Sequence, residues 1–338
     1  MVNHSLLGEV TMHIDIHCHI YPNEYVNLIK QEGARFGVEV QENSDGDRKI
    51  IVKGLTFGNL QNFTDVDLRL KKMEEMGLDM NILSFSSNPG VYWADSELAN
   101  ELCKVSNDAY AKIIKERPEK FAGFAALPAQ DGNLSSLELE RSVKELGLKG
   151  GFLGTNVNGR YLDHECFFPI YEKAASLKVP IIVHPANPAG MSEMKDYYLF
   201  NLVGFTTESA NSIGRLIFSG IFDRLPDLKF IFLHGGGTAP YLAGRFMHGW
   251  KVRKECQNIQ KSPLEYMKSN FYFDCLLFHS PVVRFLVDLI GSDRIMLGTD
   301  LPYDMTDEQI VKTLENAGLS SDEYDNISHK NAQKILNL

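Results

Sequence analysis

Cysteine is scarce in this chain, and its spacing predicts neither a disulfide framework nor a Cys-x-x-Cys pair. The five cysteines are Cys18, Cys103, Cys166, Cys256 and Cys275. A small, odd and scattered set is typical of a reducing compartment. The N-terminal residues also lack the basic segment followed by an apolar one that marks a secretory signal. We therefore expect a cytoplasmic protein, in which Met12 is a possible true start and residues 1–11 a tail without function.

Long apolar runs and positive charge are also lacking. No apolar run approaches the roughly 18–20 residues that cross a membrane. Lys and Arg number 34 against 44 Asp and Glu, a net charge of −10. Because nucleic acids and anionic membranes attract clustered cations, we expect neither as a partner. A hydrophobic content of 44% with 23% charged residues is ordinary globular usage, which excludes disordered and fibrous classes.

Short apolar, β-rich runs recur along the chain, and helix-like patterns follow most of them. The eight runs are residues 13–17, 81–86, 121–127, 151–155, 180–184, 229–234, 271–276 and 294–300. The helical patterns are residues 65–76, 97–117, 135–146, 167–177, 208–222, 281–290 and 322–336. This α/β alternation predicts a (β/α)₈ TIM barrel, with residues 1–338 as a single domain. The alternative is a doubly wound open sheet, which the absence of a Gly-rich phosphate loop after the first strand disfavours.

One unit breaks the rhythm, because a long segment at about residues 20–63 separates the first strand from its helix. Residues 35–55 partly alternate apolar and polar side chains around the turn-rich Asn43-Ser44-Asp45-Gly46-Asp47. The pattern predicts a small hairpin insertion on the catalytic face, either a lid or a loop without function. The helix after it is predicted to begin at an N-cap, Thr64, and to end at Gly77.

Ligand-type side chains end several of the predicted strands. His17 and His19 end the first as His-Cys-His, and strand alternation points both imidazoles to one side and Cys18 to the other. His184, His234 and Asp300 stand in equivalent positions. Each alone could be an ordinary hydrogen-bonding or turn residue. Together, at the barrel face where active sites lie, three histidines and a carboxylate can hold Zn²⁺ or a similar ion.

The same residues carry a family resemblance that extends from His13 to Leu338. Its motifs are Asp15-Ile16-His17-Cys18-His19, Phe124-Ala125-Ala126-Leu127-Pro128, Val183-His184-Pro185, His234-Gly235-Gly236-Gly237, Gly244-Arg245 and Leu297-Gly298-Thr299-Asp300-Leu301-Pro302. They resemble the amidohydrolase superfamily, and more closely the branch around 2-amino-3-carboxymuconate-6-semialdehyde decarboxylase. The resemblance implies that His17, His19, His184 and Asp300 hold one catalytic zinc and that His234 is the general acid/base.

Two catalytic groups are therefore expected: His234, and Asp300 as a metal ligand. We expect one Zn²⁺ per chain, or another divalent metal such as Mn²⁺. A second metal lacks its usual bridge, since Gly154-Thr155-Asn156 ends the fourth strand and Lys149 lies at the strand's other end. Gly235-Gly236-Gly237 is interpreted as allowing backbone and substrate to approach closely, or alternatively as a flexible turn.

Substrates in the resembled branch are small carboxylates, so a cation is expected near the metal. Arg245 can form a bidentate pair with a carboxylate, and the resemblance implies that it reaches the partner's site in a homodimer. Tyr198 and Tyr303 match aromatic positions of the family pocket and could hydrogen-bond the substrate. Phe57 stands where the branch has a second carboxylate-binding Arg, which argues against aminocarboxymuconate itself as the substrate.

The sequence thus predicts a metal-dependent enzyme for non-oxidative decarboxylation of a small unsaturated or aromatic acid. One alternative on the same scaffold is a hydrolase that opens a lactone, an amide or a carbon–carbon bond, with the same metal ligands and His234 protonating the leaving group. Another is a metal-binding protein without catalysis, such as a sensor. The presence of His234 beside an open-ended ligand set argues against the last.

Overall fold

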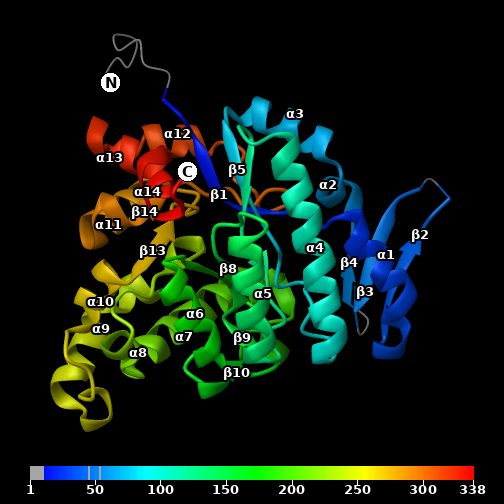
Figure 1. The fold of residues 1–338 in the computed structure, drawn as a ribbon. Coiled ribbons are helices and arrows are strands. Elements are labelled where there is room, and N and C mark those ends of the chain that lie inside the picture. The colour runs from blue at the N-terminus through cyan, green and yellow to red at the C-terminus, as the bar shows by residue number, and fades with distance from the viewer. Residues whose placement is uncertain (1–10, 45, 53–54) are drawn as a thin grey trace.

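Parallel strands close into a barrel with helices on its outside in the computed structural model, which describes residues 11–44, 46–52 and 55–338 (Figure 1). Residues 1–11, interpreted above as a tail without function, therefore lie almost wholly outside the described residues. The barrel strands are β1 (Ile14–His19), β5 (Met80–Ser84), β6 (Phe121–Gly123) with β7 (Ala125–Ala126), β8 (Gly151–Gly154), β11 (Ile181–His184), β12 (Phe230–Phe232), β13 (Phe271–Asp274) and β14 (Ile295–Met296). These are the predicted strands, so the TIM-barrel prediction is confirmed.

Two junctions close the ring. β1, β5 and β6 form one parallel sheet, and β7, β8, β11, β12, β13 and β14 form the other. At the first junction Phe124 continues β6 into β7, and its N–H donates to the Leu83 carbonyl at 2.8 Å. At the second, the Ile16 N–H donates to the Leu297 carbonyl at 3.0 Å. The first and last strands are therefore neighbours.

The barrel interior is built from residues that are buried on both strand faces, as a parallel sheet covered by helices requires. Phe230, Phe232, Phe271 and Phe273 are all fully buried. Phe230 stacks on Phe271 with ring centroids 6.1 Å apart, and Phe271 stacks on Phe273 at 6.4 Å. These closely packed aromatic side chains hold the strand ends in fixed positions, together with the side chains that the strand ends carry.

The outer layer consists mainly of α3 (Val66–Met76), α4 (Ser96–Glu116), α5 (Gly132–Lys144), α6 (Phe168–Leu177), α7 (Thr206–Phe218), α8 (Ile221–Arg224), α9 (Ala239–Val252), α10 (Pro263–Ser269), α11 (Ser280–Ile290), α12 (Ile310–Glu315), α13 (Ser321–Asp325) and α14 (Asn331–Leu336). Among the described residues, no helix combines the length and apolar character that a membrane crossing needs. Each predicted helix has a counterpart with ends shifted by a few residues, but two are divided. Residues 208–222 are shared between α7 and α8, and residues 322–336 are shared between α13, a π-helix (Asn326–Lys330) and α14.

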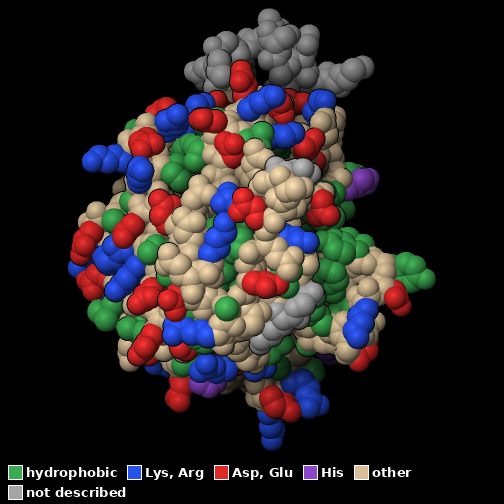
Figure 2. All heavy atoms as spheres, turned by 90° about the vertical axis from the view of Figure 1, so that its right-hand side faces the viewer, with side chains coloured by type: hydrophobic (Ala, Val, Ile, Leu, Met, Phe, Trp, Pro, Cys, Tyr) green, Lys and Arg blue, Asp and Glu red, His purple; other side chains and the backbone are tan. Residues whose placement is uncertain are grey.

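The segment after β1 contains α1 (Asn23–Glu32), a sheet and α2 (Leu60–Thr64), and it projects from one side of the barrel (Figure 1). The predicted hairpin is present: β2 (Val38–Glu42) pairs antiparallel with β3 (Arg48–Val52). A third strand, β4 (Leu55–Phe57), pairs with β3 and was not predicted. Figure 2 views this side of the molecule, where acidic and basic side chains are interspersed.

The N-cap of α3 differs from the prediction by one residue. Asp65, not Thr64, is the N-cap, and its Oδ1 accepts the Leu68 N–H at 2.9 Å. The Thr64 hydroxyl instead accepts from Arg48 of β3 at 3.1 Å. The predicted stop at Gly77 is confirmed, since Gly77 has φ 70° and its N–H donates to the last carbonyls of the helix.

Asp65→Ala should lower the free energy of unfolding by about 1 kcal/mol, because α3 loses the acceptor for one of its first N–H groups. Urea unfolding at neutral pH measures the change. Asp67→Ala is the matched control, since Asp67 is an acid in the same helical turn whose side chain is 88% exposed. Equal losses in the two variants would mean that only the negative charge matters.

Candidate metal centre

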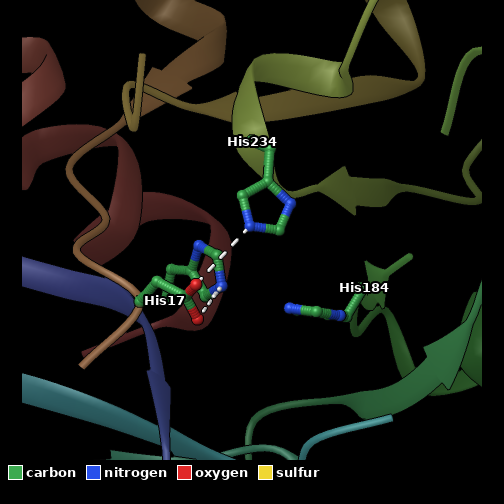
Figure 3. Close-up of side chains that lie close together, drawn as sticks. His17, His184 and His234 are labelled. Atoms are coloured by element: carbon green, nitrogen blue, oxygen red, sulfur yellow. Dashed lines mark ion pairs between the residues drawn. The ribbon is translucent and has the colours of Figure 1, made fainter. Parts of the chain in front are cut away.

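Five ligand-type side chains meet at the carboxyl end of the barrel. His17 and His19 lie in β1, His184 ends β11, His234 follows β12 and Asp300 follows β14. Figure 3 shows His17, His184 and His234 directed toward a common space. The ring centroids of His17 and His19 are 5.1 Å apart, while the Cys18 thiol donates to the Ile82 carbonyl. Strand alternation thus places the two imidazoles together and the thiol elsewhere, as predicted.

Asp300 stands at the centre of the group. Its Oδ1 lies 3.2 Å from the Nε2 of His17 and 3.1 Å from the Nε2 of His19. Its Oδ2 lies 3.7 Å from the Nε2 of His234. Ligand atoms of His17, His184, His234 and Asp300 all lie within 4.8 Å of one another. Geometry alone therefore allows either His19 or His234 to complete a four-ligand set with the other three.

Three of these histidines differ from the fourth in what lies beside Nδ1, the outer ring nitrogen. The Nδ1 of His17 lies 2.6 Å from the Asp274 carboxylate. The Nδ1 of His19 lies 2.7 Å from the Phe85 carbonyl, and that of His184 lies 2.8 Å from the Pro185 carbonyl. An acceptor at Nδ1 favours the tautomer that carries the proton there, which leaves the Nε2 lone pair free for a cation.

His234 has no such acceptor. Its Nδ1 is buried without a hydrogen-bond partner among the described residues, and its side chain is 16% exposed, whereas His17 and His19 are fully buried. Its backbone is also left-handed, with φ 55°. An imidazole that is not locked in one tautomer and can be reached from outside suits proton transfer better than permanent ligation.

The glycines after His234 are required by shape. All three have positive φ, and a Cβ would lie 2.6 Å from Leu277 at Gly235, 2.6 Å from Phe273 at Gly236 and 2.1 Å from the Thr206 carbonyl at Gly237. Tight packing rules out the flexible-turn interpretation for this segment. The turn instead holds His234 against β13 and the start of α7.

Electrostatics prepare the group for a cation. Burial would lower the pKa of His17, but Asp300 and Asp274 raise it to about 10. Burial lowers the pKa of His19 and lowers that of His184 well below its ordinary value. Burial opposes ionisation of Asp300, but the charge of His17 and the close approach of His17 and His19 hold its pKa well below the usual range. A positive charge at this position, whether a proton on His17 or a metal ion, therefore balances the buried Asp300 carboxylate.

The residues present fit a divalent metal ion. The Nε2 atoms of His17 and His19 and the Oδ1 of Asp300 are buried without hydrogen-bond partners among the described residues. Unsatisfied buried polar atoms are costly, and a cation between them would satisfy all three. The donor set of imidazole nitrogen and carboxylate oxygen suits Zn²⁺, and Mn²⁺ also accepts it.

The three predicted substrate-binding residues, Tyr303, Tyr198 and Arg245, differ in their contacts and exposure. The Tyr303 ring lies edge-on to His19 at 5.5 Å, but its hydroxyl is already bonded to Ser86 and the Asn88 carbonyl. Tyr198 is half-exposed, its ring lies edge-on to Phe200 at 4.7 Å, and its pKa is raised by partial burial and by the charges of Asp304 and Asp300. Arg245 lies on α9, exposed, and forms no ion pair with any described residue.

Phe57, which occupies the expected Arg position, is in β4 of the insertion. It lines a cavity of about 610 Å³ together with Asn59 from the insertion and Tyr303 and Asp304 from the segment after Asp300. The insertion therefore lies beside the loop that follows the metal-centre residue Asp300.

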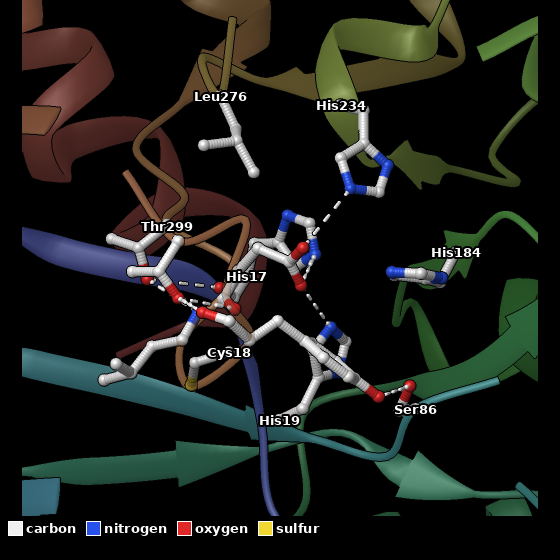
Figure 4. Close-up of polar contacts among 12 residues, drawn as sticks. His17, Cys18, His19, Ser86, His184, His234, Leu276 and Thr299 are labelled. Carbon is white, nitrogen blue, oxygen red and sulfur yellow. Dashed lines mark hydrogen bonds and ion pairs between the residues drawn. The ribbon is translucent and has the colours of Figure 1, made fainter. Parts of the chain in front are cut away.

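Several residues beneath the metal centre were missed by the sequence analysis. Asp274 ends β13 and bonds His17; the rule that singles out polar residues at strand ends would have found it. Asp15 accepts from the Thr299 hydroxyl at 2.7 Å and from Asn81 at 3.1 Å. Figure 4 shows Thr299 among the polar contacts around His17 and His19. Buried Arg69 donates to the His19 carbonyl. No sequence signal marks Arg69, because its role depends on where α3 packs.

A family model described as amidohydrolase matches residues 14–338. The chain belongs to the amidohydrolase family. It is 33% identical over 334 residues to 2-amino-3-carboxymuconate-6-semialdehyde decarboxylase from Dictyostelium discoideum, covering 97% of this chain and 92% of that protein. It is 34% identical over 289 residues to gamma-resorcylate decarboxylase from Polaromonas sp. strain JS666, covering 80% of this chain and 87% of that protein.

A solved amidohydrolase relative has the same fold. It is a dihydroxybenzoic acid decarboxylase from Polaromonas sp. JS666 with bound manganese and the inhibitor 2-nitroresorcinol. The TM-score is 0.79 at 29% identity, over 97% of this chain and 98% of that one. The predicted family and enzyme class are confirmed, since the named relatives are decarboxylases of amidohydrolase type.

Chain stripped with a chelator should bind close to one equivalent of Zn²⁺ in an equilibrium titration. His19→Ala should weaken that binding strongly, because it removes one of the three imidazoles whose tautomer is set for ligation. His234→Ala should bind nearly as tightly as the unmodified chain. Two tight equivalents, or metal loss only with His234→Ala, would contradict this assignment.

Proposed function

We propose that this amidohydrolase is a metal-dependent, non-oxidative decarboxylase of a small aromatic or unsaturated carboxylic acid. The observation that carries the proposal is the division among the histidines. His17, His19 and His184 have acceptors at Nδ1 and direct Nε2 inward, whereas His234 has a free Nδ1 and some exposure. A ligand set and a separate proton donor suit this reaction. A hydrolase would use the same residues, and the likeness to gamma-resorcylate and dihydroxybenzoic acid decarboxylases favours decarboxylation.

His17, His19, His184 and Asp300 would hold the metal, for which we propose zinc or manganese. When bound, the metal supplies positive charge that orients and polarises the acidic oxygens of the substrate. Manganese is the metal in the related dihydroxybenzoic acid decarboxylase. His17 and His19 are fully buried, whereas His234 is partly exposed, so the substrate would reach the centre from the side of His234.

His234 would supply the proton. Protonated His234 donates it to the substrate carbon that bears the carboxylate. The C–C bond to the carboxylate then breaks, its electron pair restores the unsaturation or aromaticity, and CO₂ leaves. The imidazole is left neutral and regains a proton from solvent, to which its partial exposure gives access. The Asp300 Oδ2 lies 3.7 Å from the Nε2 of His234.

Tyr198 and Tyr303 would shape the pocket in different ways. The Tyr303 hydroxyl is occupied by Ser86 and Asn88, so this residue offers its ring edge as a wall. Tyr198 makes no hydrogen bond through its hydroxyl to the described residues, so its phenol would bond a polar group of the substrate. A ring hydroxyl beside the carboxylate, as in dihydroxybenzoic acid, is a suitable group.

The test is product analysis with metal-loaded enzyme. Zinc- and manganese-loaded enzyme is incubated with a panel of hydroxybenzoic acids and unsaturated diacids, and with lactones and amides as hydrolase substrates. Metal-dependent release of CO₂ with formation of the decarboxylated compound supports the proposal. Metal-dependent addition of water without CO₂, which is the hydrolase outcome, would contradict it.

His234→Ala should keep its metal and lose turnover by about 10²–10⁴-fold, because a positioned acid/base group contributes that much. The measurement is kcat on the best acid of the panel, with metal content determined on the same sample. His13→Ala is a matched control, since His13 directly precedes β1 at the end of the barrel opposite the metal centre. Unchanged kcat in metal-loaded His234→Ala would remove the proton-donor role.

We also propose that the enzyme works as a homodimer with Arg245 at the interface. Tyr241, Arg245, His248 and Val252 are all exposed and follow a 4-3-4 spacing, which puts them on one face of α9. Tyr241 is 83% exposed and Val252 is 58% exposed. An arginine flanked by exposed apolar side chains is typical of an interface. In the dimer its guanidinium would bind a substrate carboxylate in the partner's site.

Mixed dimers test the role of Arg245. Arg245→Ala and His17→Ala chains should each be inactive, but subunit exchange should restore part of the activity. One site of the mixed dimer then has its own ligands and an intact arginine from the partner. Arg245→Lys should already lower kcat/KM, since an ammonium cannot replace the planar fork. Two parents that stay inactive after verified exchange would assign Arg245 to its own chain.

A further inference from the structure

Asp274 is a fully buried carboxylate that none of the proposed catalytic steps uses. Its Oδ2 lies 2.6 Å from the Nδ1 of His17 on β1. Its Oδ1 accepts the Gly235 N–H at 2.7 Å, in the turn directly after His234, and also the Leu276 N–H at 3.4 Å. One side chain therefore bonds both a proposed metal ligand and the turn that presents the proposed proton donor.

The position of this carboxylate is tightly constrained. It ends β13, between the neighbours β12 and β14 in the sheet. A Cβ at Gly298 would lie 2.8 Å from the Cβ of His17 and 2.9 Å from that of Asp274, so only glycine lets these two side chains meet. Asp274 cannot swing away without losing two backbone donors to Oδ1.

We propose that Asp274 is a positioning residue that sets the His17 tautomer through one oxygen and the His234 turn through the other. This inference rests on the proposed metal role of His17. Oδ2 keeps the proton on the His17 Nδ1 and so directs the Nε2 lone pair toward the metal centre. Oδ1 holds Gly235 and thereby fixes where His234 stands relative to Asp300. A single carboxylate thus fixes the position of the proposed metal ligand relative to that of the proposed proton donor.

Asp274→Asn separates the two functions. The amide oxygen would keep Gly235 and Leu276, because both backbone donors point at that position. The amide nitrogen would then face the His17 Nδ1, where donor meets donor. His17 would relieve this by moving its proton to Nε2, which is the nitrogen that must be free for metal. Asp274→Ala would remove both interactions.

The first measurement is metal affinity, which does not depend on turnover. Competition with a chromophoric chelator should show Zn²⁺ binding about 10–100-fold weaker in Asp274→Asn than in the unmodified chain, the usual effect of losing such an outer partner. Glu138→Gln is the matched control: it removes a buried carboxylate on α5 that bonds Arg141 and Asn107, away from the metal centre. Equal affinity in Asp274→Asn and the unmodified chain would overturn the proposal.

The second measurement is NMR of the ¹⁵N-histidine-labelled chain loaded with zinc. The unmodified chain should show a downfield, slowly exchanging proton on the His17 Nδ1, which Asp274→Asn should lose. Absence of that proton in the unmodified chain would also overturn the proposal, even if the variants fail to fold. Neither this signal nor metal affinity requires decarboxylation, so failure of the proposed reaction would leave both results interpretable.

The third measurement separates the two oxygens. At saturating metal, Asp274→Asn should recover most of its kcat, because the His234 turn is still held. Asp274→Ala should stay at least about 10-fold below it at the same metal occupancy, because Gly235 is no longer bonded and His234 is misplaced. Equal kcat values in the two variants at full occupancy would contradict the role of Oδ1.

Discussion

The metal centre depends on the closure of the barrel between its first and last strands. The Asp300 N–H donates to the His17 carbonyl at 2.8 Å, and the His19 N–H donates to the Leu301 carbonyl at 2.7 Å. These two bonds place residues that are more than 280 positions apart in the chain beside each other. They set the Asp300 carboxylate against the Nε2 atoms of both β1 histidines. The other ligand-type residues reach the same space because their strands complete the same ring.

Closure of the barrel also brings opposite charges close together, and this explains why charged groups can be buried in the metal centre. An isolated buried carboxylate or imidazolium is expensive, but an opposite charge at close range compensates. The Asp300 carboxylate lies beside the Nε2 of His17, and the Asp274 carboxylate lies beside its Nδ1. Asp15, beneath, is bonded to Thr299 and Asn81, although burial still raises its pKa to about 6. The floor of the centre is therefore a network of paired polar groups that apolar strands hold rigid.

Much of the fold could be predicted because it depends on short-range patterns. Apolar runs of strand length and helical spacings between them are local properties, and all eight strand positions appear where they were expected. His17, His19, His184, His234 and Asp300 could also be found, since a strand's end is visible in sequence. The errors were local as well: Asp65 rather than Thr64 caps α3, and β4 adds a third strand to the hairpin.

The sequence by itself determined the strand order, the residue types at the strand ends and the family. The family resemblance implied which of those residues are ligands and which is the proton donor, but only the tertiary structure shows the contacts that distinguish them. Whether an imidazole is a ligand or a proton donor depends on what meets its outer nitrogen, and the partners of His17, His19 and His184 come from Asp274, Phe85 and Pro185. Asp274 is distant in sequence from His17, and Phe85 is distant from His19. Their contacts exist only once the strands lie side by side, because hydrogen bonds act over about 3 Å and take no account of chain position.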